Sequence, residues 1–296
     1  MESNVSSASM TSCSNNEVRR CRPLLGTFVE IAATHDGAIN AAFAAVERVQ
    51  RQMSFHDAGS EVAQLNRYAV DGPMPVSDET YEVLAWAWEL YDRTDGVFDI
   101  AVAPELMQWG ILPGQAAGRP RGRTRDIALL LGRFVQFLRP LQIDLGGIAK
   151  GYAVDKAIEA MRASGATSGL VNAGGDLRCF GDREQQVWVR HPRTSGALLR
   201  LPALKDAALA TSANSYQRQR RRGRVICAHV DGRTRQPVLR SFSVSVRAPS
   251  CLVADALTKV VLARGAAAAS VLGQFGATAY IVRPDNQLSY CEERTA

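Results

Sequence analysis

A pair of adjacent glycines at Gly146-Gly147 marks the stretch of this chain best suited to bind a phosphate, and a second pair occurs at Gly174-Gly175. Asp144 precedes Gly146-Gly147, and Asp176 follows Gly174-Gly175. Adjacent glycines let the backbone approach a ligand because no Cβ stands in the way. Lys150 follows the first pair, and a cation in a first helical turn is unfavourable unless an anion lies nearby. Asp144 could accept a hydrogen bond from a sugar hydroxyl or a base N–H, or bind a metal.

The elements that must position these groups are predicted to be a strand, a glycine turn and a helix. Residues 142–145 form a short apolar run, and the apolar residues after the turn share one helical face: Ile148, Tyr152, Ala153, Ala157, Ile158 and Met161. The N-terminus of such a helix suits a phosphate. The spacing is neither Gly-x-Gly-x-x-Gly nor a Walker loop. An ordinary strand–turn–helix with a surface lysine therefore remains the alternative from this stretch alone.

The composition indicates a globular protein. The chain has 296 residues, of which 46% are hydrophobic and 22% charged, which suits one large or two small domains. It has no apolar run near the ~18 residues that a membrane helix needs. The net charge of +6 comes partly from the arginines of residues 218–224. These lack interleaved aromatic residues, so a solvated loop is favoured over a single-strand nucleic-acid binder.

Six cysteines are scattered along the chain without any Cys-x-x-Cys pair, which argues against a zinc knuckle or a thioredoxin-like site. Residues 1–21 are rich in Ser and Asn, have no apolar core segment, and are expected to be a disordered leader. Because no secretory signal is seen, a cytoplasmic location is expected.

Long amphipathic helices and short strands follow one another along the chain. Helices are predicted at 38–53 and 77–93, the second with Leu84, Trp88 and Tyr91 as a core stripe. Residues 170–181 are predicted to be one strand, and short strands follow at hairpin spacing. Polar groups recur at the ends of these elements, where binding sites are usually built.

Seven segments in order resemble the ApbE-type FAD:protein FMN transferase family. The resemblance spans about residues 22–288 and is carried by Leu25–Thr27, 53–66, Gly96–Asp99, Asp144–Asp155, Val171–Asp176, Ala210–Ser212 and Ala254–Leu257. Each match alone is weak. Seven in register make the resemblance specific.

The resemblance implies that residues 22–296 form a single domain with an α+β, two-lobed mixed fold. It also implies FAD in a central cleft and a divalent metal, usually Mg²⁺, on the pyrophosphate of FAD. It also implies transfer of FMN from FAD to a Thr hydroxyl of an acceptor flavoprotein, with release of AMP. The acceptor would carry a motif like Ser/Asp-Gly-Ala-Thr. The positions expected to contact FAD are Leu25, His56, Val97, Phe98, Asp99, Asp144, Lys150 and His229. Those expected to hold the metal are Gly147, Asp255 and Thr258.

The chemistry of the reaction gives two of these residues catalytic roles. Splitting a pyrophosphate builds charge on phosphoryl oxygens, so a metal and cations should dominate catalysis. A hydroxyl nucleophile needs a base near neutral pH, for which His229 is the best candidate. Asp255 is assigned to catalysis as a metal ligand.

Two positions depart from the family pattern. Arg235 stands where the His-containing motif has glycine, and that motif is one residue short here. Lys259 stands at a Thr of the helix motif, and Thr258 comes one residue earlier. A lysine amine beside a metal repels it, so Lys259 would either weaken metal binding or supply part of the metal's charge.

Three functions therefore remain open. The first is FMN transfer; the second is hydrolysis of FAD to FMN and AMP, in which water replaces the Thr hydroxyl. The third is FAD binding without catalysis, which the departures at Arg235 and Lys259 motivate. Metal dependence and the appearance of AMP separate the binder from the two enzymes.

Overall fold

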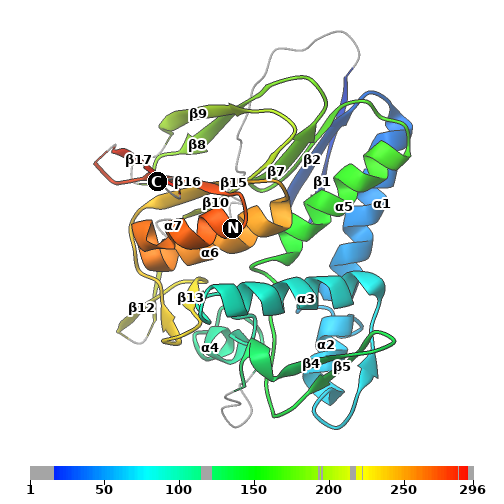
Figure 1. Cartoon of the computed structure of the whole chain (residues 1–296), viewed down its shortest axis with the longest axis vertical. Coiled ribbons are helices and arrows are strands. Elements are labelled where there is room, and N and C mark those ends of the chain that lie inside the picture. Colours follow the sequence, from blue (N-terminus) through cyan, green and yellow to red (C-terminus); the bar gives the residue numbers. More distant parts are fainter. Residues whose placement is uncertain are drawn as a thin grey trace.

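The chain folds into two lobes, and the larger lobe is built on an eight-stranded antiparallel sheet (Figure 1). The computed structural model describes residues 17–114, 122–192, 194, 196–213, 218–221, 223–285 and 287–292. The strands lie in the order β1 (Val18–Leu24), β2 (Thr27–Ala33), β6 (Gly169–Ala173), β7 (Asp176–Phe180), β10 (Ala208–Ala213), β15 (Ser243–Ala248), β16 (Thr278–Val282) and β17 (Leu288–Cys291).

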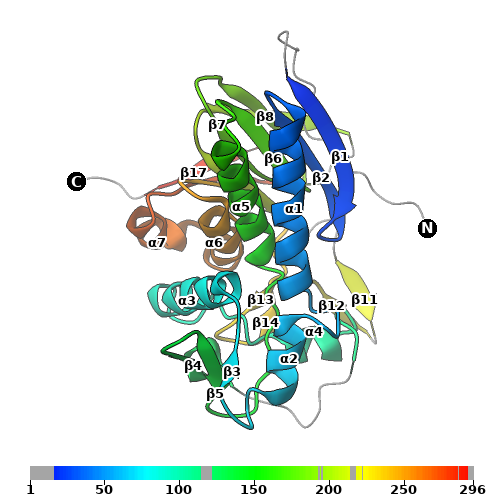
Figure 2. The ribbon, with the colours of Figure 1, turned by 90° about the vertical axis from the view of Figure 1, so that its right-hand side faces the viewer.

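Helices cover one face of this sheet, and a β-hairpin covers part of the other (Figures 1 and 2). The helices are α1 (Asp36–Met53), α5 (Ala149–Ala163), α6 (Cys251–Arg264), η2 (Gly265–Ala268) and α7 (Ala269–Gln274). The hairpin is β8 (Gln185–Arg190) with β9 (Leu198–Leu204). Neighbouring residues of β2 show why both faces are covered: Ile31 belongs to the core under the helices, and Ala32 to the smaller core under the hairpin.

The second lobe lies beyond the ends of α1 and α5 (Figure 2). Its helices are α2 (Glu61–Tyr68), α3 (Asp78–Arg93), α4 (Ala103–Gln108) and η1 (Thr124–Asp126), and its small sheet has the order β3 (Met74–Pro75), β5 (Phe134–Phe137), β4 (Ile127–Leu130). Two further hairpins pair β11 (Gln219–Arg221) with β12 (Arg224–Ile226) and β13 (Val230–Asp231) with β14 (Gln236–Pro237). The larger hydrophobic cluster contains residues of both lobes. The predicted α+β class is confirmed.

Local signals explain where the helices begin. The side chains of Ser60, Ser77 and Ser250 each accept a hydrogen bond from the third residue beyond them, which satisfies an N–H that the helix leaves unpaired. The predicted core stripe of α3 is only partly correct. Leu84 is buried, but Trp88 is 43% exposed. The buried face runs instead through Thr80, Val83, Leu84, Ala87 and Leu90.

Three boundaries differ from the prediction. The expected leader is too long, because residues 18–21 already pair in β1; residues 1–16 lie outside the described part of the chain. Residues 141–145 belong to no strand. The predicted single strand over 170–181 is a hairpin, since the chain reverses at Gly174 (φ 64°) and Gly175 (φ 103°) between β6 and β7.

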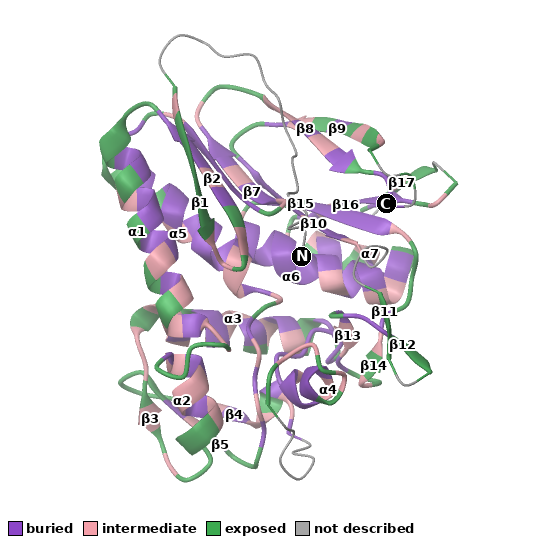
Figure 3. Cartoon of the chain, turned by 180° about the vertical axis from the view of Figure 1, so that it is seen from behind, coloured by how far each residue is buried: buried purple, intermediate pink, exposed green. Residues whose placement is uncertain are grey.

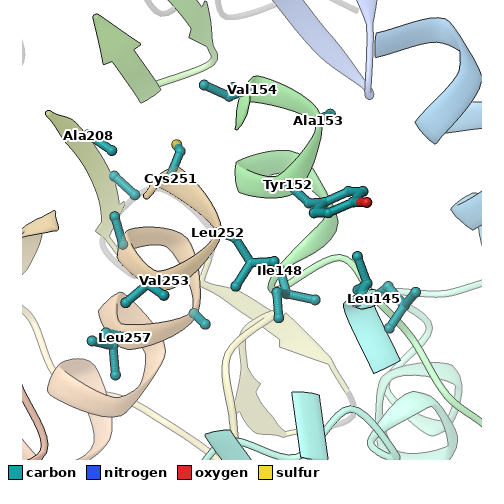
Figure 4. Packing of buried hydrophobic residues seen from close by; sticks show 14 of the residues in the cluster. Leu145, Ile148, Tyr152, Ala153, Val154, Ala208, Cys251, Leu252, Val253 and Leu257 are labelled. Carbon is teal, nitrogen blue, oxygen red and sulfur yellow. The ribbon is translucent and has the colours of Figure 1, made fainter. Parts of the chain in front are cut away.

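Helices α5 and α6 pack closely, and this contact places the site described below (Figure 4). A Cβ at Gly151 of α5 would lie 2.2 Å from the Cys251 carbonyl oxygen, so only glycine fits there. Asp155 accepts hydrogen bonds from the N–H groups of Cys251 (2.9 Å) and Leu252 (2.8 Å), and pairs with Arg178 at 2.6 Å. The carboxylate thus caps α6 from α5.

Burial is greatest along α6 and the middle strands of the sheet (Figure 3). Helix α6 is buried on almost every side, as a helix without a polar face should be. Within the described residues, no helix has the length and apolar character needed to cross a membrane.

Candidate active site

A cavity of about 710 Å³ opens at the junction of the sheet, α5, α6 and the second lobe. This volume is in the range of small-molecule and cofactor sites. Every residue predicted from the sequence to contact FAD lines it: Leu25, His56, Val97, Phe98, Asp99, Asp144, Lys150 and His229. These residues come from segments far apart in the chain, so the fold brings them together.

The β1–β2 turn forms one edge of the cavity. Leu25 (φ 55°) and Gly26 (φ 70°) both have positive φ, as the tight hairpin turn between antiparallel strands requires. A non-glycine residue in this region is strained. The Leu25 N–H donates to Gln50 Oε1 of α1 at 2.5 Å, which holds the turn against the helix at the cavity edge.

The segment before the first glycine pair is held by a side chain. Asn66 accepts from the Ile143 N–H at 2.7 Å and donates to the Ile143 carbonyl at 2.9 Å. The Asp144 N–H donates to the Ile100 carbonyl at 2.8 Å. These bonds place the Asp144 carboxylate at the cavity. Burial raises the pKa of Asp144, although the Gly146 N–H and His56 oppose the shift.

Two carboxylates and two ammonium groups form a compact cluster between α5, β7 and α6. Lys150 Nζ pairs with Asp176 and lies 3.6 Å from Asp255 Oδ2. Lys259 Nζ pairs with Asp255 Oδ1 and donates to the Asp255 carbonyl at 2.9 Å. Both lysines line the cavity. The anions explain how Lys150 tolerates the first turn of α5.

The cluster shifts the pKa values of its members in opposite directions. Burial alone would raise the pKa of Asp255, but Lys150 and Lys259 outweigh it and hold the pKa below its ordinary value. Burial and the neighbouring Asp255 raise the pKa of Asp176. Burial disfavours the Lys150 ammonium, yet Asp176 and Asp255 raise its pKa overall. Asp255 is therefore the most firmly ionised carboxylate of the cluster.

The groups expected to hold Mg²⁺ are engaged by other partners. Asp255 is fully buried, with Oδ1 paired to Lys259 and Oδ2 accepting from the Gly151 N–H at 3.1 Å. The Thr258 hydroxyl donates to the Asp255 carbonyl at 2.7 Å and lies 2.8 Å from Ser212 Oγ.

Lys259 also lies beside Gly147, because a Cβ there would stand 3.7 Å from Lys259 Cε. Two unit charges 4 Å apart interact by about 4 kcal/mol at the effective dielectric of a protein, so an ammonium and a divalent ion on one carboxylate would repel each other strongly. The residues as arranged do not suit the expected Mg²⁺.

His229 enters the cavity wall just before β13 and is buried. Its carbonyl accepts from the Val238 N–H at 2.8 Å, which fixes the backbone. Burial, followed by the charges of Lys259 and Lys150, lowers the pKa of His229 to about 3. The imidazole is therefore neutral near pH 7, as a proton acceptor must be.

Asp99 lies in the wall with its carboxylate fully committed to protein partners. Oδ1 accepts from the N–H groups of Ala101 (2.9 Å) and Thr124 (3.1 Å), and from the Thr124 hydroxyl at 2.8 Å. Oδ2 pairs with Arg235 at 3.2 Å. Asp99 therefore shapes the wall, and its expected contact with FAD stays a prediction.

Arg235, which stands at the family's glycine, keeps the backbone that glycine favours, with φ 58°. Its side chain does not line the cavity and donates to the carbonyls of Ala101 and Gly122, the latter at 2.8 Å. It also pairs with Glu105 at 3.2 Å. The Arg235 side chain thus connects the turn between β13 and β14 to the second lobe.

Several cavity residues were not among the predicted FAD contacts or metal ligands. They include Gly174, Asp176, Thr211, Ser212 and Lys259. Asp176 and Gly174 lie in the conspicuous Asn-Ala-Gly-Gly-Asp run, so the motif itself was a usable signal. The position of Lys259, four residues after Asp255, also predicts their pairing on one helix face.

The sequence and the fold are similar to those of known proteins. Residues 25–281 match the model of the ApbE family, and the chain belongs to that family. A structure of the ApbE protein from Thermotoga maritima superposes with a TM-score of 0.81 at 25% identity, covering 95% of this chain and 100% of that one. The apo flavinyl transferase ApbE of Pseudomonas stutzeri gives 0.79 at 22% identity, covering 96% and 97%, and shows the same fold.

Two curated relatives are each named FAD:protein FMN transferase. The protein from Haemophilus influenzae is 26% identical over 88% of this chain and 85% of its own length. The protein from Chlamydia pneumoniae is 30% identical over 69% of this chain and 68% of its own length. Sequence and fold thus agree on the family.

Proposed function

We propose that this chain is an FAD:protein FMN transferase, which moves FMN from FAD to a hydroxyl of an acceptor flavoprotein and releases AMP. The observation that carries the proposal is the cavity: in a chain of the ApbE family, all residues expected to contact FAD line one cavity. The name of the relatives, FAD:protein FMN transferase, supports transfer of FMN from FAD to a protein. The acceptor would present its threonine in a Ser/Asp-Gly-Ala-Thr-like motif.

The reaction divides into tasks that this chain's residues can perform. The acceptor hydroxyl oxygen attacks the phosphorus of the FMN half, the bridging P–O bond breaks, and AMP leaves with that oxygen. The ammonium groups of Lys150 and Lys259 face the cavity and would stabilise the charge that develops on the phosphoryl oxygens. The glycines at 146–147 and 174–175 let the backbone approach the diphosphate.

His229 would accept the hydroxyl proton, because its imidazole is neutral and lines the same cavity. The anionic diphosphate would offset the charges of Lys150 and Lys259, which lower the pKa of His229 in the free protein. The base would therefore strengthen once FAD is bound. Asp255 would act through Lys150 and Lys259, whose ammonium groups it holds. The two lysines, and not Mg²⁺, carry the positive charge in this proposal, because Asp255 and Thr258 are engaged by other partners.

The test is incubation of the purified protein with FAD and an acceptor domain that contains Ser-Gly-Ala-Thr, followed by mass spectrometry of the acceptor and chromatography for AMP. We expect one FMN per acceptor threonine and an equal amount of AMP. His229→Asn should lose this activity. His35→Asn is the matched control, because His35 caps α1 at Ala38 N–H and does not line the cavity.

The other outcomes discriminate between the alternatives. AMP with free FMN and an unlabelled acceptor would replace the transferase with an FAD pyrophosphatase. FAD that stays intact while bound would replace it with a flavin-binding protein. Either result contradicts the proposal.

A further inference from the structure

Lys259 occupies the place where the family resemblance expects a metal. Its ammonium pairs with Asp255 Oδ1 and donates to the Asp255 carbonyl at 2.9 Å. Its Cε lies 3.7 Å from where a Cβ of Gly147 would stand. Asp255 and Gly147 are two of the three positions expected to ligate the metal, and the third, Thr258, directly precedes the lysine. The Thr258 hydroxyl and the Lys259 ammonium donate to the same acceptor, the Asp255 carbonyl, at 2.7 and 2.9 Å.

The ammonium is also directed toward the ligand space. The Lys259 side chain lines the cavity and keeps 16% exposure, although its partner Asp255 is fully buried. A lysine ammonium has three N–H donors. Two are directed at Asp255, which leaves the third for an anion in the cavity.

We propose that the Lys259 ammonium takes the place of a divalent cation in this active site, so that Lys150 and Lys259 together hold the diphosphate of FAD and its cleavage needs no added metal. This inference rests on the proposed function, because it assigns the charge-stabilising groups of that reaction. A lysine binds phosphate as a point charge. Asp255 lies one helical turn before Lys259 in α6, and its carboxylate positions the Lys259 ammonium.

The first experiment compares AMP release by the unmodified protein in excess EDTA and in Mg²⁺, with FAD and the acceptor domain. The two rates should agree within about twofold. Lys259→Thr supplies the hydroxyl that the family has there and frees Asp255. Its rate should fall by about 10²-fold in EDTA, the typical loss for one charge-stabilising donor, and recover when Mg²⁺ is added. Unmodified protein that requires Mg²⁺ would overturn the inference.

The second experiment measures metal binding without relying on activity. Mn²⁺ is titrated into the protein without FAD and followed by electron paramagnetic resonance. Lys259→Thr should bind one Mn²⁺, and the unmodified protein should bind none at this site. Lys156→Thr is the matched control. Lys156 is also a helix lysine that forms ion pairs, with Glu82 and Glu159, but it does not line the cavity. It should behave like the unmodified protein.

The two experiments separate this inference from the proposed function. If no condition releases AMP, the transferase proposal fails, and the Mn²⁺ titration alone decides the role of Lys259. Tight, stoichiometric binding of Mn²⁺ to the unmodified protein would overturn the inference. If Lys259→Thr does not fold, the EDTA comparison on the unmodified protein still decides it.

Discussion

Lys259 and Asp255 form an ion pair within a single helix, one turn apart in α6, where the carboxylate is fully buried and the ammonium reaches the cavity. The pair fixes the Lys259 ammonium where it lines the cavity. Lys150 joins it from α5 at 3.6 Å from Asp255 Oδ2. Asp255 therefore connects two helices as well as two cations.

Asp255→Asn should destabilise the fold. The substitution leaves Lys150 and Lys259 without their shared anion, and breaking a buried ion pair costs about 3 kcal/mol. The free energy of unfolding from urea titration measures this loss. Glu89→Gln removes the carboxylate of an exposed i,i+4 pair with Arg93 and should cost less than about 1 kcal/mol. Equal losses in the two variants would contradict the role assigned to Asp255.

Gly151→Ala should separate α5 from α6. The new Cβ would lie 2.2 Å from the Cys251 carbonyl oxygen and 2.8 Å from Asp255 Cβ, and overpacking of this kind costs about 2 kcal/mol. The control is Gly72→Ala, where a Cβ meets nothing within 4 Å. Thermal melts should show a lower Tm for the first variant only. An unchanged Tm for Gly151→Ala would mean that the helices are farther apart.

Asp155→Asn should loosen the start of α6. The carboxylate accepts from two backbone N–H groups, of Cys251 and Leu252, and pairs with Arg178. Loss of a buried, hydrogen-bonded charge should cost about 3 kcal/mol, measured by denaturant unfolding. Asp36→Asn, which removes an exposed partner of Arg20, is the comparison and should change little. Near-native stability of Asp155→Asn would show that α6 does not depend on this cap.

His229 should make the protein less stable in acid. Its folded pKa of about 3 lies below the ordinary value of 6.5, so the unfolded chain binds more protons between these pH values. Stability from this group is therefore complete above pH 6.5 and declines as the pH falls toward 3. At pH 5 the loss is up to about 2 kcal/mol, since one pKa unit is about 1.4 kcal/mol.

Unfolding free energies at pH 7 and pH 5 test this for the unmodified protein and for His229→Asn. The variant should lose less stability between the two pH values than the unmodified protein does. The control His35→Asn should keep the full pH dependence, because His35 lies outside the cavity. An identical pH dependence in His229→Asn and the unmodified protein would show that His229 titrates normally.

The sequence predicted the parts of this molecule that local signals determine. The helices at α1 and α3 follow from apolar spacing and, for α3, from the Ser77 cap, so both appear close to the expected bounds. The segment 142–145 was wrongly predicted to be a strand, because its partner is the side chain of Asn66, distant in the chain. The turn at Gly174 was missed, because a glycine pair inside an apolar run does not show which way the chain bends.

The site was predicted less completely than the fold. The positions expected to contact FAD came from motifs, and they line one cavity. The charge cluster could not be predicted, because Lys150, Asp176 and Asp255 are far apart in the sequence and meet only after α5, β7 and α6 pack. Arg235 looked disruptive as a residue type, yet its side chain finds partners outside the cavity.

The most direct test of the proposed role of Lys259 is a crystal structure of the protein with FAD, grown in the presence of Mg²⁺. We expect the flavin nucleotide in the cavity, with its diphosphate within hydrogen-bonding distance of the Lys150 and Lys259 ammonium groups, and Lys259 still paired with Asp255. A diphosphate bound away from these lysines would contradict it. So would a metal ion that joins the diphosphate to Asp255 and displaces Lys259.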